Sequence, residues 1–233
     1  MAVLIILISL GALGLVLYLI EKCKNYSLKG VLLKFIVSLL FVSVAIYSSY
    51  VRSGHVMSAL IIIGLILGLS GDVWLDLKYV YPKDDKIYTY AGFIVFGLGH
   101  VLFITGMCLE FFHDANPLYI IIPIVASLIF GIINQLLAKP LKLKFNDLTW
   151  IVYVYSVLLF TTPLMALSLS ILNNWTSTTL IMFIVGGALF AISDIVLSTT
   201  YFGEGHEKPI DFILNYVTYY SAQFVIATSL FFI

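Results

Sequence analysis

Two aspartates interrupt apolar stretches of the sequence in which carboxylates are rare. Asp72 lies within LGLSGDVWLDL, and Asp194 ends GALFAISD. Because a charge at the centre of a membrane helix costs roughly 2.5 to 3.5 kcal/mol on insertion scales, such residues usually face a polar interior and carry function. Two carboxylates at one site can divide the roles of acid and base. We therefore predict Asp72 and Asp194 as catalytic residues, with a structural bond to a neighbouring helix as the alternative.

A second set of polar residues lies in similar apolar surroundings. Asn215, Tyr219 and Gln223 have i, i+4, i+8 spacing, so they form one polar stripe on a helix. Tyr220 adjoins this stripe, and His100 lies deep within another apolar run. We expect these five residues to bind substrate or support the site, because a polar stripe is unfavourable against lipid.

The histidines do not predict a metal centre. His55, His113 and His206 fall in polar connections on different sides of the expected bundle, while His100 is deep within a span. Zinc requires N, S or O ligands that converge at bonding distance. We therefore expect neither a metal nor a cofactor.

The composition indicates which elements must position these residues. Hydrophobic residues make up 62% of the 233 residues and charged residues only 10%, which leaves too little polar surface for a water-soluble globule. The formal net charge of zero argues against nucleic acid as a partner, since phosphate binding needs clustered Lys and Arg. The sequence thus predicts an integral membrane protein surrounded by membrane lipid.

Long apolar runs predict the transmembrane segments. A run of about 20 residues at 1.5 Å per residue matches a bilayer core of about 30 Å. Eight such runs, separated by charged or turn-forming segments, predict an all-α bundle of eight transmembrane helices in a single domain, 1–233. The expected helices lie near residues 2–20, 31–50, 56–77, 87–110, 117–138, 148–172, 178–201 and 210–232.

The charged loops orient this bundle in the membrane. Eleven of the twelve Lys and Arg residues flank the odd-numbered connections, and Arg52 lies on the other side. Because cytoplasmic loops are enriched in Lys and Arg, we expect both termini on the non-cytoplasmic side. The same rule explains the positions of these lysines without a bound ligand. Asp76 is close to Lys78 in the sequence, and we expect it to be solvated at the interface.

An internal repeat relates the two halves of the chain. Asp72 and Asp194 lie 122 residues apart, at matching depth in the third and seventh spans, and each follows a glycine eight positions earlier. His100 and Gln223 are 123 residues apart in the fourth and eighth spans. This spacing favours two four-helix units in parallel topology, related by an axis along the membrane normal.

Four short segments resemble the signature segments of a known family. They are SGD at 70–72, FGLGH at 96–100, GALFAISD at 187–194 and TYYSAQ at 218–223. In their order, and in the eight-helix plan, the chain resembles the YhhN-like lysoplasmalogenase family over nearly its whole length. The last two segments carry most of the resemblance, because a Gly-Asp pair alone is not specific.

The resemblance implies a reaction and a set of site residues. Family members hydrolyse the vinyl ether bond of lysoplasmalogens, and they release a fatty aldehyde and glycerophosphoethanolamine or glycerophosphocholine. The positions that match the family's polar site residues are Asp72, His100, Asp194, Tyr219, Tyr220 and Gln223. One departure is Phe103, where the family pattern implies a tyrosine three residues after the histidine.

The predicted site residues suit this reaction. Protonation of a vinyl ether at its β-carbon gives an oxocarbenium ion, which water captures to form a hemiacetal and then an aldehyde. A protonated carboxylic acid and a second carboxylate can carry such chemistry, as they do in glycosidases. We therefore expect a lysophospholipid as substrate, with the roles of acid and base open between Asp72 and Asp194.

A proton-coupled transporter or a receptor is the competing functional class. Intramembrane carboxylates also carry protons or bind cations, and paired four-helix units can rock against each other. A carrier opens its site to both sides of the membrane, whereas the polar residues here cluster toward one side. The sequence therefore favours the enzyme.

Overall fold

Eight long helices account for most of the chain. The computed structural model describes residues 1–24, 26–52, 54–113, 115–203 and 208–233. Within these residues the regular structure is helical throughout, so the all-α prediction is confirmed. The α-helices are α1 (Ala2–Lys22), α2 (Leu28–Val51), α3 (Val56–Val80), α4 (Asp85–Phe111), α5 (Leu118–Ala138), α6 (Thr149–Leu172), α7 (Thr178–Phe202) and α8 (Pro209–Ser229).

The helices begin and end within a few residues of the expected spans. α2 starts at Leu28, earlier than expected, because the Ser27 hydroxyl caps it by accepting a hydrogen bond from the Gly30 N–H at 3.2 Å. The Ser177 hydroxyl caps α7 in the same way on the N–H of Leu180, at 3.3 Å. His206, which we expect in the connection before α8, lies outside the described residues.

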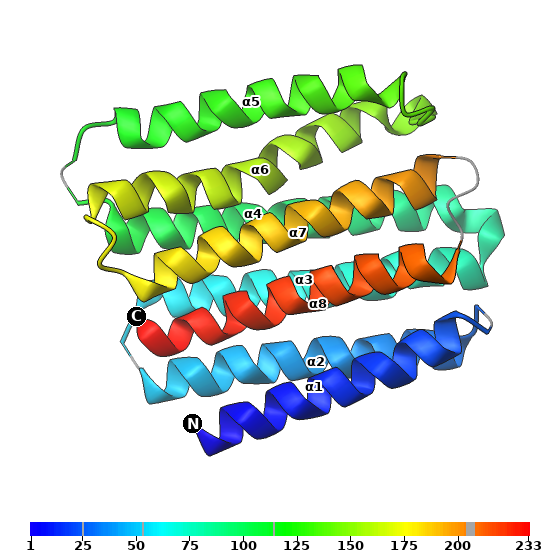
Figure 1. Cartoon of the computed structure of the whole chain (residues 1–233), viewed down its shortest axis with the longest axis horizontal. Helices are drawn as coiled ribbons and strands as arrows, with labels where there is room; N and C mark the ends of the chain where they lie inside the picture. The colour runs from blue at the N-terminus through cyan, green and yellow to red at the C-terminus, as the bar shows by residue number, and fades with distance from the viewer. Residues whose placement is uncertain (25, 53, 114, 204–207) are drawn as a thin grey trace.

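The helices run along one common direction, and both termini lie at the same end of the bundle (Figure 1). α2 packs between α1 and α3, as α6 packs between α5 and α7. α3 lies along α4 and α7 along α8, while α4 contacts α6 as α8 contacts α2. This pattern of neighbours agrees with the expected repeat, and it makes α3 and α7 equivalent elements.

A close approach between α3 and α4 fixes the centre of the bundle. Glycines lie where the two helices meet, and a Cβ added at Gly99 would lie 3.0 Å from the carbonyl oxygen of Gly64. At Gly64 an added Cβ would lie 2.5 Å from the ring of Phe103. Small residues allow membrane helices to approach this closely, so the glycines hold α3 in place against α4.

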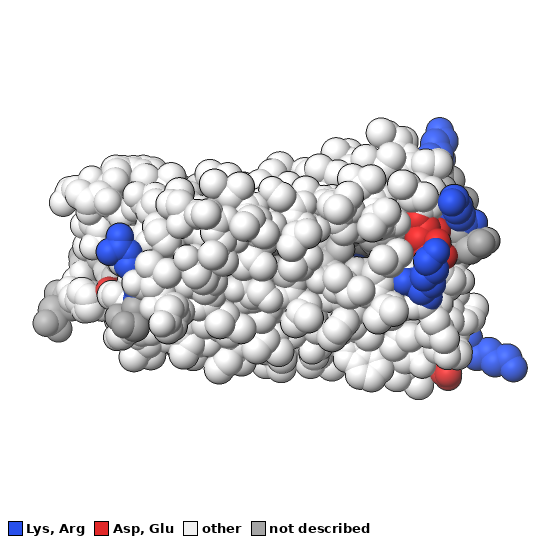
Figure 2. All heavy atoms as spheres, turned by 90° about the horizontal axis from the view of Figure 1, so that it is seen from below, with Lys and Arg blue, Asp and Glu red and all other residues white. Residues whose placement is uncertain are grey.

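The outer surface is that of a membrane protein. The helices α1 to α7 are each long and apolar enough to cross a membrane, and the chain is therefore an integral, multi-pass membrane protein. α8 has a similar length of 21 residues, but its polar stripe makes it less apolar, and it packs against α7, α2 and α1. The face in Figure 2 is almost uncharged along its middle, with Lys and Arg gathered mainly at one end.

Candidate active site

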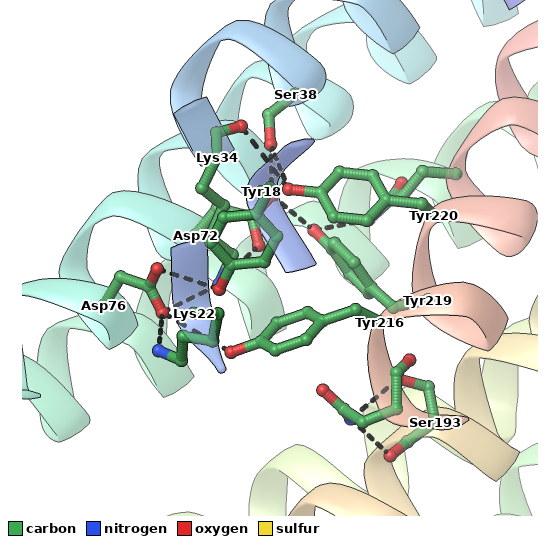
Figure 3. A network of polar contacts seen from close by, with 12 residues as sticks. Tyr18, Lys22, Lys34, Ser38, Asp72, Asp76, Ser193, Tyr216, Tyr219 and Tyr220 are labelled. Carbon is green, nitrogen blue, oxygen red and sulfur yellow. Dashed lines mark hydrogen bonds and ion pairs between the residues drawn. The ribbon is translucent and has the colours of Figure 1, made fainter. Parts of the chain in front are cut away.

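Asp72 lies inside the bundle on α3, where only 2% of its surface is exposed. Its Oδ2 accepts hydrogen bonds from the Ser38 hydroxyl at 2.6 Å and the Tyr219 hydroxyl at 2.9 Å. Its Oδ1 lies 3.3 Å from the Lys34 ammonium (Figure 3). Helices α2 and α8 therefore supply a cation and two hydrogen-bond donors, the compensation that a buried carboxylate requires.

The ion pair at Asp72 belongs to a longer buried network. The Lys34 ammonium also lies 3.5 Å from Asp76, and the Lys22 ammonium donates to Asp76 at 2.8 Å. Lys22 and Lys34 are only 5% and 2% exposed. Charges thus alternate along Asp72, Lys34, Asp76 and Lys22, so that each buried charge has an opposite charge beside it (Figure 3).

The expectation that Asp76 is solvated at the interface is wrong. Asp76 is 3% exposed, and it accepts hydrogen bonds from the hydroxyls of Tyr18 at 2.9 Å and Tyr216 at 3.4 Å. The explanation of every lysine as a loop charge fails for Lys22 and Lys34. Tertiary packing is the reason, because side chains of α1 and α8 enclose Asp76, which its position in the sequence places near water.

Asp194 has a different environment on the equivalent helix α7. Its side chain is half-buried, and its Oδ2 accepts a hydrogen bond from the hydroxyl of Tyr155 on α6. No Lys or Arg among the described residues forms an ion pair with it. One aspartate is thus paired with a lysine and the other with a phenol.

A single cavity joins the two aspartates, and we call it the reactive cavity. Its volume is about 30 Å³, enough for about two water molecules. Asp72 and its partner Lys34 line it, as do Asp194 and its partner Tyr155. The rest of the lining includes Leu75, Phe93, Phe96, Phe190, Ser193, Leu197, Tyr201, Asn215, Tyr216 and Tyr219.

A second cavity lies between Asp194 and the apolar outer surface, and we call it the lateral cavity. Its volume is about 40 Å³, and it shares Tyr155, Asp194 and Tyr201 with the reactive cavity. Its wall also includes Ile195, which is 52% exposed on the apolar surface, and Asn134 of α5. The wall of the lateral cavity therefore includes both Asp194 and a residue of the apolar outer surface.

The polar stripe of α8 faces the interior, and its side chains form hydrogen bonds there. The Asn215 side-chain amide donates to the carbonyl oxygen of Ser193 at 2.8 Å and lines the reactive cavity. The Tyr219 hydroxyl donates to Asp72 and accepts from the Gln223 amide at 3.0 Å. The structure therefore brings Asn215 and Tyr219 to the cavity, with Gln223 behind Tyr219.

Tyr220 and His100 are buried but do not line the reactive cavity. The Tyr220 hydroxyl lies 3.1 Å from the Ser38 hydroxyl, which itself bonds Asp72. His100 Nδ1 lies 2.9 Å from the Thr162 hydroxyl, and the imidazole packs against the ring of Phe190 with centroids 4.9 Å apart. Both residues support groups that reach the cavity.

Phe103 also lies away from the reactive cavity. Its ring is 2% exposed and packs against Gly64, His100 and Phe183. The departure from the family pattern at this position therefore changes helix packing rather than a group that meets the cavity.

Sequence reasoning missed three residues that complete the site, namely Lys34, Ser38 and Tyr155. A signal for Lys34 and Ser38 was present, because they are spaced i, i+4 inside an apolar span and so share one helix face. The repeat also carried a signal for Tyr155, which follows Lys34 by 121 residues, close to the spacing of the aspartates.

A metal ion has no evident set of ligands in this site. Among the residues that the structure describes, no group of three or more His, Cys, Asp or Glu side chains is arranged to hold one. The polar side chains that line the reactive cavity are instead carboxylates, phenols, a hydroxyl, an amide and an ammonium, groups suited to hydrogen bonding and proton transfer.

Comparisons with known proteins place the chain in a family. The model of the YhhN family matches residues 30–230. That match begins within α2, so it leaves α1, with Tyr18 and Lys22, outside it. No curated protein and no solved structure matches the chain. Because the match covers α3 to α8 and nearly all of α2, with both aspartates and the lining of the two cavities, the chain belongs to the YhhN family.

Proposed function

We propose that this protein is a lysoplasmalogenase, a hydrolase that cleaves the vinyl ether bond of lysoplasmalogens. Its products would be a fatty aldehyde and glycerophosphoethanolamine or glycerophosphocholine. The observation that carries the proposal is that two intramembrane aspartates with different partners line one small cavity next to the lipid-facing surface. Membership of the YhhN family is consistent with this reaction.

The environments of the two aspartates support a division of roles between them within this proposal. The Lys34 ion pair stabilises the charged carboxylate of Asp72, which suits a group that stabilises a cation. Asp194 has no cation beside it among the described residues, so its neutral carboxylic acid is the better proton donor. Asp194 is accordingly the acid, and Asp72 is the carboxylate that faces the developing positive charge.

The proposed reaction conserves protons over one cycle. Asp194 donates its proton to the β-carbon of the vinyl ether, and an oxocarbenium ion forms at the α-carbon. Water in the reactive cavity adds to that carbon and returns a proton to Asp194, which gives a hemiacetal. The hemiacetal hydroxyl then loses its proton as the bond from carbon to the glycerol oxygen breaks, and that oxygen gains a proton. The net change is the addition of one water.

The lateral cavity provides the proposed route for the substrate. The alkenyl chain is apolar and stays in lipid, while the vinyl ether reaches Asp194 between α5, α6 and α7. The reactive cavity is too small for the alkyl chain but admits the water that hydrolysis consumes.

Aldehyde release from lysoplasmenylethanolamine by the purified protein tests the proposal. We expect Asp72→Asn and Asp194→Asn each to lower the rate at least about 100-fold, the scale of lost acid or base catalysis. The control is Asp84→Asn, which removes an exposed carboxylate from the turn before α4 and should retain full activity. If the folded parent protein releases no aldehyde from any vinyl ether lipid offered, the proposal fails.

A proton-coupled carrier is the second candidate function, and the buried ion network is the observation that favours it. Alternating lysines and aspartates inside a membrane bundle are typical of proton pathways. Proton flux into vesicles that contain the protein, abolished by Asp72→Asn, would support the carrier. Aldehyde release in detergent, where no gradient exists, would support the enzyme.

The proposed orientation places both termini on the non-cytoplasmic side. The termini share one end of the bundle, and the connections rich in lysine share the other (Figures 1 and 2). Since cytoplasmic loops are enriched in Lys and Arg, the lysine-rich end would face the cytoplasm.

A further inference from the structure

A third cavity opens at the lysine-rich end of the bundle, and we call it the loop-end cavity. Its volume is about 310 Å³, and residues of α3, α4, α7 and the connection between α5 and α6 line it. The charged residues of its wall are Lys78, Asp85, Lys86, Lys144 and Asp147. With three lysines and two aspartates, the wall complements a molecule that carries both a negative and a positive group.

Lys78 lies on the wall of this cavity and packs against an aromatic ring. Its side chain is half-buried, and its ammonium lies 3.1 Å from the centre of the Tyr201 ring. Among the described residues, no carboxylate oxygen lies within 4.0 Å of it. Lys86, by contrast, pairs with Asp147 at 2.6 Å. An ammonium on a cavity wall without a carboxylate partner favours an anionic ligand.

The loop-end cavity adjoins the two cavities at Asp194. Tyr201 lines all three cavities, and Phe202 lines the loop-end and lateral cavities. Asp194 precedes Tyr201 by seven residues on α7, which is about 10 Å along the axis at helical rise. In a lysoplasmalogen seven bonds join the vinyl β-carbon to phosphorus, which span on the order of 9 Å at ordinary bond lengths. The two separations agree.

We propose that the loop-end cavity binds the phosphate head group of the lysophospholipid, with Lys78 as the residue that pairs with the phosphate. Asp85 offers a carboxylate to the amine of the head group, so the cavity suits a zwitterionic head group. This assignment rests on the proposed function for its substrate, and it places the head group in water while the vinyl ether reaches Asp194.

The test compares two ligands that cannot be hydrolysed. One is hexadecyl-lysophosphoethanolamine, which has a saturated ether and a phosphate head group, and the other is hexadecylglycerol, which lacks the head group. We expect Lys78→Gln to weaken binding of the first about tenfold or more, the scale of a lost charged hydrogen bond, and to leave binding of the second unchanged. Titration calorimetry with the purified protein in detergent measures both affinities.

Two further variants complete the design. Lys83→Gln makes the same change on an exposed lysine of the turn between α3 and α4 that does not line the cavity, so it should alter neither affinity. Lys86→Gln changes a second, exposed lysine of the wall and should weaken only the phosphate-containing ligand, by a few-fold. Equal effects of Lys78→Gln on both ligands, or no effect of either wall variant, would overturn the assignment.

The outcomes separate this assignment from the proposed function. If the protein hydrolyses no vinyl ether yet binds the lysophospholipid through Lys78, the result supports the head-group site and contradicts the proposed reaction. If inorganic phosphate binds in a manner that depends on Lys78 while the lysophospholipid does not, the cavity takes free phosphate and the lipid assignment fails. Hydrolysis of the vinyl ether by Lys78→Gln at an unchanged KM would support the proposed reaction and contradict the assignment of the head group to this cavity.

Discussion

At Lys34, one ammonium group lies beside two carboxylates in the interior of a membrane protein. Its ammonium lies 3.3 Å from Asp72 and 3.5 Å from Asp76. Lys34→Met leaves Asp72 buried without its cation, and breaking a buried pair in this way costs about 3 to 5 kcal/mol. We expect the free energy of unfolding to fall by at least about 3 kcal/mol, measured by denaturant titration in detergent.

Lys29→Met is the matched control for this change. Lys29 lies on the same helix, but its side chain is 71% exposed and pairs with Glu21 at 3.2 Å. A surface pair of this kind contributes at most about 1 kcal/mol. The double variant Lys34→Met, Asp72→Asn should recover stability without recovering activity. Equal destabilisation by Lys29→Met and Lys34→Met would contradict the argument, because burial would then not be the cause.

At the scale of helices, the contact between α3 and α4 depends on a pair of glycines. A Cβ at Gly99 would lie 3.0 Å from the backbone carbonyl oxygen of Gly64, which cannot move without shifting α3. We expect Gly99→Ala to lower the free energy of unfolding by about 1 to 3 kcal/mol, as overpacking does. Thermal unfolding of the purified protein would measure the change.

Gly97→Ala provides the comparison two residues away on α4. A Cβ there would lie 3.4 Å from a methyl carbon of Leu158, which is an ordinary contact with a flexible side chain. The change should therefore stay within about 0.5 kcal/mol. A similar loss in both variants would point to a general effect of alanine on α4 rather than to close helix packing.

The sequence predicts the helices far better than it predicts what surrounds each aspartate. Apolar runs and turn residues locate the spans, because length and hydropathy are properties of each segment alone. The environment of Asp76 depends on Tyr18 and Lys22 of α1, and that of Asp194 depends on Tyr155 of α6. Which helices become neighbours is decided by packing, so the prediction that Lys22 and Lys34 are loop charges is wrong.

For the whole molecule, the repeat explains how one site holds two unlike carboxylates. Equivalent helices α3 and α7 bring Asp72 and Asp194 to one cavity. The helix before each differs in its contribution, with Lys34 from α2 and Tyr155 from α6. The spacing in the sequence predicts that the two aspartates occupy equivalent positions. Their chemical difference comes from neighbouring residues, which differ between the two halves of the repeat.

The proposed orientation makes a prediction for the native cysteines. Cys23 is exposed beside the end of α1, and the chain has two cysteines, so Cys108→Ala leaves Cys23 as the single thiol. We expect a membrane-impermeant maleimide to label this variant in permeabilised cells and not in intact ones, because Lys-rich loops stay in the cytoplasm.

A cysteine at the opposite end of the bundle should react in the reverse manner. His113 is exposed between α4 and α5, so His113→Cys, in a chain with both native cysteines replaced by alanine, should be labelled in intact cells. Labelling of Cys23 in intact cells would show that the bundle is inserted the other way round.

The buried ion network also bears on how the protein is made. Lys22 and Lys34 belong to α1 and α2, whereas their carboxylate partners belong to α3, which the ribosome synthesises later. Until α3 is inserted, each lysine would lie in the bilayer without its counter-ion, which is unfavourable for an ammonium group. The first three helices therefore gain their full stability only together, and their release from the insertion machinery into lipid should be cooperative, as one unit of three.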